Sequence, residues 1–228
     1  MTEEPLADAR DMFAVHTMFR REFGLLPGLV RGVTAGDAER AAVVGDHVAL
    51  MSRLLHLHHS GEDKHIWPLL RERGAGKITQ IVDVMEEQHE RIHQEYLRAG
   101  EALTAWREHA PADGGDALAG AIEQLIPQLE AHLSLEEDRV VPLIERYVTA
   151  AEYARLAGEG AEDTPPGLLP VCLGMVMYDA EPAVIEMIIA ELPAQLRPAF
   201  PRAANEAYAA YAQRLHGPVP VPKLADSR

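Results

Sequence analysis

The sequence contains little of what other fold classes need. It has one cysteine, Cys172, which excludes an internal disulfide and a cysteine-rich metal site. Aromatic residues make up only 5 % of the 228 residues, and runs of β-branched residues are few. Alanine, leucine and glutamate, which favour helices, are abundant instead. These features predict an all-α protein.

Basic runs and long hydrophobic runs are also missing. The chain has 21 Lys and Arg against 36 Asp and Glu, a formal charge of −15, which argues against nucleic-acid and membrane-surface partners. The longest apolar stretch, residues 168–178, is too short to span a bilayer. The acidic N-terminus lacks the apolar core of a signal peptide. We therefore expect a cytoplasmic protein.

Apolar residues recur at helical spacing through the first two thirds of the chain. Four long helices are predicted, over residues 8–33, 38–73, 77–108 and 116–148. Long helices joined by short loops favour an up-down-up-down antiparallel four-helix bundle over residues 1–150. Pro68 should bend the second helix near its end, and Pro127 and Pro142 are expected to kink the fourth helix.

The remaining third of the chain changes character. Residues 158–167, rich in Gly, Pro and acidic residues, predict a linker. Residues 151–215 are expected to form a C-terminal extension of shorter helices that packs on the bundle. Residues 216–228, with three prolines, predict a disordered tail. The apolar face within residues 168–192 predicts a cap over the bundle, with a dimer interface as the alternative.

An internal repeat gives the strongest functional signal. The ends of the second and fourth predicted helices align without gaps, because His58, Glu62 and Pro68 have the same spacing as His132, Glu136 and Pro142. His16 and His89 align more weakly in the first and third helices. The repeat also argues against His59 as a ligand, because its counterpart in the fourth helix is Leu133. We therefore interpret His59 and Asp63 as a chance pair on the helix surface.

Residues four apart on a helix lie on one face, with Cβ atoms about 5–6 Å apart, so both side chains can reach one cation or two adjacent cations. Three helices carry such pairs and the first helix offers one histidine. The predicted metal ligands are His16, His58, Glu62, His89, His93, His132 and Glu136. Imidazoles with carboxylates suit non-haem iron, zinc or copper. A division of the five histidines into three and two leaves one metal with an open position.

This combined pattern resembles the hemerythrin and HHE-type cation-binding family over roughly residues 8–148. The resemblance implies two iron ions with an oxo or hydroxo bridge, held also by bridging Glu62 and Glu136, and reversible binding of O2 or related NO or peroxide chemistry. The animal oxygen carriers have His-xxxx-Asp in the last helix. This chain has His132-xxx-Glu136, and Glu137 at the next position could compete.

Two main hypotheses about function follow. The centre is either a binding module for a small diatomic ligand or peroxide, or a di-iron oxidase, oxygenase or peroxide-decomposing enzyme whose C-terminal helices shape a pocket. An iron-storing or purely structural metal bundle is a weaker third option. The sequence identifies neither a substrate nor a protein partner, and it does not determine the oligomeric state.

Overall fold

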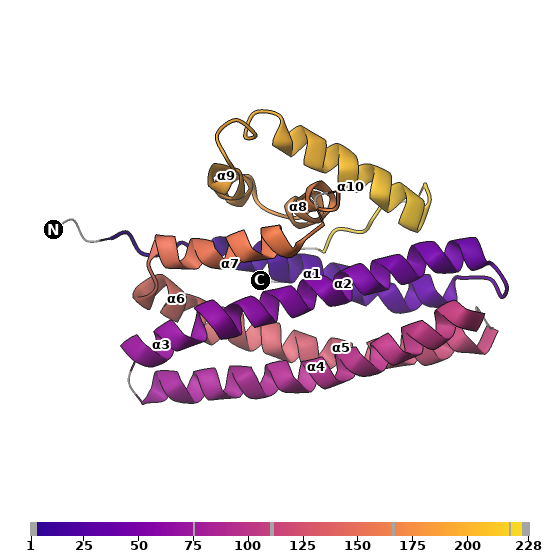
Figure 1. The fold of residues 1–228 in the computed structure, drawn as a ribbon, viewed down its shortest axis with the longest axis horizontal. Helices are drawn as coiled ribbons and strands as arrows, with labels where there is room; N and C mark the ends of the chain where they lie inside the picture. Colours follow the sequence, from indigo (N-terminus) through magenta and orange to yellow (C-terminus); the bar gives the residue numbers. More distant parts are fainter. Residues whose placement is uncertain (1–3, 75, 110–111, 166, 219, 225–228) are drawn as a thin grey trace.

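The protein is an all-helical bundle with further helices packed on one side, in a computed structural model that describes residues 4–74, 76–109, 112–165, 167–218 and 220–224 (Figure 1). The helices are α1 (Arg10–Arg31), α2 (Ala38–His65), α3 (Trp67–Arg73), α4 (Lys77–His109), α5 (Ala112–Arg139), α6 (Val141–Tyr147), α7 (Ala150–Asp163), α8 (Leu169–Met177), α9 (Pro182–Glu191) and α10 (Phe200–His216). Among the described residues, no helix is both long and apolar enough to cross a membrane.

The bundle consists of α1, α2, α4 and α5, which run alongside one another over most of their length (Figure 1). The apolar face of each helix points toward the other three helices. One residue from each helix illustrates the shared buried core: Phe19, Met51, Ile92 and Leu129. The four long helices and the all-α class are therefore as the hydrophobic spacing predicts.

Two prolines break the bundle helices where the repeat places them. α2 ends at His65 and α3 begins at Trp67, with Pro68 in the first turn of α3. α5 and α6 repeat this arrangement with Pro142. Proline lacks the amide that an interior helical position needs, but the first turn of a new helix tolerates it. The predicted bends at Pro68 and Pro142 are confirmed, whereas α5 continues as one helix through Pro127.

The predicted linker over residues 158–167 is wrong for its first half, because α7 continues to Asp163. Thr149 begins α7 with a capping box, in which its side chain accepts from the Glu152 amide and the Glu152 carboxylate accepts from the Thr149 amide. α7 lies closely against α2, since a Cβ on Gly61 would lie 2.5 Å from Leu156 Cδ1. The linker prediction rests on the glycine content of this segment. Packing against α2 stabilises α7 despite its glycines, so the helix continues into the segment predicted as a linker.

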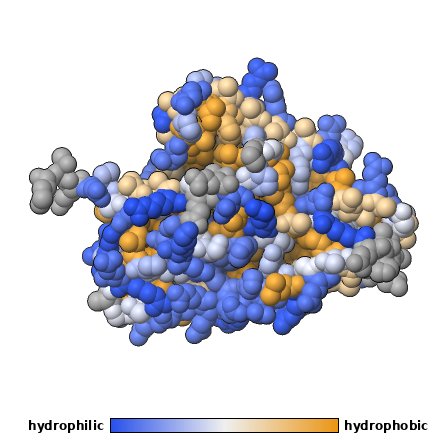
Figure 2. Space-filling view, in the orientation of Figure 1, coloured by the Kyte–Doolittle hydropathy of each residue, from blue (hydrophilic) through white to orange (hydrophobic). Residues whose placement is uncertain are grey.

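The C-terminal helices α8, α9 and α10 form a layer over α1 and α2 (Figure 1). α8 and α10 pack so closely that a Cβ on Gly174 would collide with the Ala204 carbonyl oxygen. Figure 2 shows hydrophobic residues gathered within and beneath this layer, and a mostly hydrophilic surface along the opposite side of the bundle. Part of the segment predicted as a tail also packs, since Val221 is buried and its carbonyl accepts from the Tyr178 hydroxyl at 2.8 Å.

A buried polar network joins this layer to the bundle. The Arg21 guanidinium donates to Glu22 Oε1 at 2.9 Å and to the Met175 carbonyl at 2.9 Å, and it pairs with Asp179. Tyr208 donates to Glu22 Oε1 at 3.0 Å, and His47 Nε2 lies 3.2 Å from Glu22 Oε2 without the alignment of a hydrogen bond.

Glu22 makes the stability of this network depend on pH. Burial raises the pKa of Glu22, but His47 and Arg21 outweigh it and lower the pKa to about 2. A carboxyl with a lowered pKa stabilises the fold by about 3 kcal/mol at neutral pH and loses this contribution as pH falls from about 4.5 toward 2. Urea unfolding of wild type and Glu22→Gln across that range should show a stability difference that shrinks with acidification. A constant difference would contradict the assignment.

Candidate metal centre

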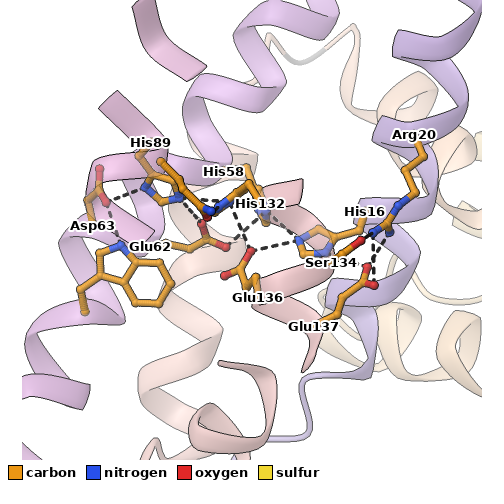
Figure 3. A network of polar contacts seen from close by, with 12 residues as sticks. His16, Arg20, His58, Glu62, Asp63, His89, His132, Ser134, Glu136 and Glu137 are labelled. Atoms are coloured by element: carbon orange, nitrogen blue, oxygen red, sulfur yellow. Dashed lines mark hydrogen bonds and ion pairs between the residues drawn. The ribbon is translucent and has the colours of Figure 1, made fainter. Parts of the chain in front are cut away.

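The four long helices bring six of the seven predicted ligands together between them, near the start of α1 and the ends of α2 and α5, where they form the network in Figure 3. α1 contributes one histidine, α4 contributes another, and α2 and α5 each contribute a histidine and a glutamate four residues later. Because that spacing places both side chains on one helix face, the pairs from α2 and α5 point at each other. The converging residues are His16, His58, Glu62, His89, His132 and Glu136.

The first donor group consists of His16, His58, Glu62 and Glu136. The Nε2 atoms of His16 and His58 lie 3.2 Å apart. Glu136 Oε2 lies 3.4 Å from His16 Nε2, and Glu62 Oε1 lies 3.3 Å from His58 Nε2. Four donor atoms from three helices thus surround one point in the core.

The second donor group consists of His59, His89 and His132, all buried. The Nε2 atoms of His89 and His132 lie 3.3 Å apart. The His59 ring stacks on the His89 ring, with centroids 4.1 Å apart and an interplanar angle of 11°. Glu62 Oε2 lies 3.5 Å from His89 Nε2, so the two oxygens of Glu62 face one donor group each.

Three of these imidazoles also have a polar partner at Nδ1, the ring nitrogen that does not face the donor groups. His16 Nδ1 lies 3.0 Å from a Glu137 oxygen, which also accepts from Arg20 at 2.6 Å. His89 Nδ1 lies 2.8 Å from Asp63 Oδ1, and Trp67 donates to that same oxygen at 2.8 Å. Carboxylates in this position fix the ring tautomer and orientation of metal-binding histidines.

His132 is held in the same way, since its Nδ1 lies 3.1 Å from Gln88 Oε1. With an acceptor at each Nδ1, the proton belongs on Nδ1 and the lone pair of each Nε2 points inward, an assignment made from the partners. His89 Nε2 and His132 Nε2 therefore face each other as two acceptors 3.3 Å apart. Two nitrogens that share a cation at about 2.1 Å lie roughly 3–3.5 Å apart, so this spacing suits a shared cation.

Burial keeps most of these imidazoles neutral. It lowers the pKa of His58 and His59 well below the usual value and that of His132 to about 3. Burial also opposes charge on His16, but the nearby carboxylates of Glu136 and Glu137 raise the pKa of His16 overall. Neutral imidazoles are the form that binds a metal.

The two central carboxylates, Glu62 and Glu136, indicate most clearly that the donor set suits a cation. All four oxygens of Glu62 and Glu136 are buried and have no hydrogen-bond partner among the described residues, and the same holds for His59 Nε2. Burial and the nearby Glu136 raise the pKa of Glu62 well above its usual value. Burying such groups unpaired is costly, and metal coordination is the usual compensation. The donor set therefore fits metal cations.

His93 and His59 are placed differently from the sequence interpretation. His93 is half-buried outside both donor groups, with its ring 5.9 Å from that of His56, whereas His59 belongs to the second group. The repeat could have indicated the position of His59, because its counterpart Leu133 is apolar and apolar residues favour the core. The structure buries Leu133 fully. Equivalent positions in a repeat face the same way, so residue 59 also faces the core. Glu137 lies outside the groups and supports His16.

A four-helix bundle with histidines and carboxylates converging on buried donor groups defines a class of helical cation-binding proteins. The chain matches the Hemerythrin HHE cation binding domain over residues 8–144. The protein therefore belongs to this family, and the match ends before α7, so the C-terminal helices lie outside it.

Curated relatives carry no functional description. An uncharacterized protein of Mycobacterium tuberculosis and another of Mycobacterium bovis are each 25 % identical over 159 residues. The matched region covers 68 % of this chain and 60 % of each relative, so the chain spans about three fifths of the length of the curated relatives it matches. No solved structure matches.

Proposed function

We propose that the centre holds two iron ions and binds a small ligand there, O2, NO or peroxide. The observation that carries this proposal is the placement of Glu62, whose two oxygens each face a different donor group. A carboxylate in that position would be a ligand to both cations if two were bound. When bound, iron supplies the electrons for reversible O2 binding, and mixed imidazole and carboxylate ligands with an open position suit non-haem iron.

The chain's own residues position and protect the centre. Glu137 and Asp63 orient His16 and His89, and the bundle core keeps bulk water away from Glu62 and Glu136, which are fully buried. The second donor group offers three imidazoles and a share of Glu62. The first offers two imidazoles with both carboxylates.

The binding hypothesis is favoured over the enzyme hypothesis by the position of a cavity. The cavity that reaches His59 and His89 is lined by α2 and α4, and none of its lining residues comes from α8, α9 or α10. A substrate enzyme that uses the C-terminal helices would need them at the centre. Their polar contacts instead reach Glu22 and His47, and neither residue lines that cavity.

Anaerobic titration tests this function. The protein is loaded with Fe2+ without oxygen, exposed to O2 and then flushed with argon. A spectrum that forms with O2 and reverses under argon supports reversible binding. Immediate and irreversible oxidation, with consumption of a reductant in repeated cycles, would instead support the enzyme.

The two disputed histidines give a separate test of the donor set. We expect His59→Ala to lower bound Fe2+ from two ions per chain to one, because it removes a buried imidazole from the second donor group. His93→Ala should leave the content at two, because His93 lies outside both groups. Metal analysis after gel filtration measures both. Loss of one ion in His93→Ala and none in His59→Ala would reverse the assignment.

A further inference from the structure

A cavity of about 250 Å³ lies between α2 and α4 and leads to the metal centre. Its inner residues are buried and include His59 and His89, one from each helix and both in the second donor group. Its outer residues are exposed or half-buried. The cavity is therefore a path from the surface to two imidazoles of the centre.

The outer part of the cavity carries a second pair of imidazoles that the centre does not use. The rings of His56 and His93 have centroids 5.9 Å apart, and Tyr96 stacks beside both. Two imidazoles that share one cation place their centroids roughly 5–6 Å apart, given metal to nitrogen bonds of about 2.1 Å. His56 and His93 come from different helices, so one cation would join α2 to α4 at the surface.

The charges along the cavity favour a cation. Asp63, Glu86 and Glu90 line it and are exposed, and its lining among the described residues includes no lysine or arginine. Arg71 pairs with Glu86 at 2.8 Å, whereas Asp63 accepts from the Trp67 indole and Glu90 accepts from the Gln94 amide, which are neutral donors. A cleft lined by charges of one sign raises the local concentration of ions of the opposite sign.

We propose that this cavity is the route by which a divalent first-row cation such as Fe2+ reaches the centre, with His56 and His93 as the first ligands that capture it. The inference rests on the proposed metal function. Transfer then runs from the outer imidazole pair to His59 and His89, through a cavity whose lining also carries the carboxylates of Asp63, Glu86 and Glu90. A neutral gas needs neither the outer imidazoles nor the carboxylates.

The rate of metal loading tests the route with the full chain. Metal-free protein is mixed with Co2+, whose visible absorption reports its ligands, and loading is followed by stopped flow. The double variant His56→Gln, His93→Gln should load at least tenfold more slowly, with the wild-type final stoichiometry and spectrum. Glu90→Lys should also slow loading. His216→Gln, which changes a histidine on α10 outside the cavity lining, is the matched control and should load at the wild-type rate.

Each outcome separates the inference from the proposed function. Wild-type loading rates in the double variant would overturn the route and leave the centre intact. A lower stoichiometry or a changed final spectrum would place His93 or His56 in the centre and also overturn the route. If the same variants slow only the O2 reaction of preloaded protein, the cavity admits gas instead. Failure of wild type to bind Co2+ or Fe2+ would refute the metal function itself.

Discussion

Glu62→Gln should strongly weaken binding of the second cation without lowering the stability of the metal-free protein. The substitution keeps the shape of the side chain and removes the charge that would bridge the two donor groups. Loss of an outer partner of a ligand costs about 10–100-fold in metal affinity, so loss of a bridging ligand should cost more than about 100-fold. Equilibrium dialysis with Fe2+ under argon measures the affinity.

The stability of the metal-free variant provides the second half of this prediction. Both oxygens of Glu62 are buried without hydrogen-bond partners among the described residues, and burial raises the pKa of Glu62 well above its usual value. A neutral amide should therefore be tolerated to within about 1 kcal/mol or should stabilise the fold. Glu123→Gln, at an exposed carboxylate on α5, is the matched control and should retain both cations. A variant that loses more than 3 kcal/mol before metal is added would make Glu62 structural instead.

Arg21→Met should release the C-terminal helices from the bundle. Arg21 is buried and pairs with Glu22 and Asp179, and its guanidinium lies 5.2 Å from the centroid of the Tyr178 ring. Removing it leaves two carboxylates buried without their cation, which typically costs about 3–5 kcal/mol. Amide hydrogen exchange should become faster in α8 and α10, and urea unfolding should show the loss of stability.

The matched control for Arg21 is Arg202→Met. Arg202 pairs with Glu206 on the surface of α10, and exposed ion pairs contribute less than about 1 kcal/mol. Metal content should stay at the wild-type value in both variants, because neither arginine belongs to a donor group. Unchanged exchange in α8 and α10 of Arg21→Met would show that apolar packing alone holds this layer.

The sequence predicts the bundle and most of the centre because both depend on regular spacing. Helical periodicity fixes which residues face inward, and the repeat of His58 and Glu62 in His132 and Glu136 places four donors without any tertiary information. The two proline breaks follow from local backbone chemistry.

What the sequence did not predict depends on contacts between distant residues. The i,i+4 pattern favoured His93, but the packing of α2 against α4 sets His59 beside His89 and leaves His93 near the surface. The outer role of Glu137 depends on its distance from His16, which no local pattern encodes. The Arg21 network joins residues more than 150 positions apart, so its formation could not be read from local sequence.

Anomalous diffraction from crystals of the iron-loaded protein tests the central claim most directly. The account predicts two peaks within one bundle, one bounded by His16 and His58 and the other by His59, His89 and His132, with Glu62 between them. A lone peak between His56 and His93, or a fully loaded protein with no iron beside Glu62, would contradict it.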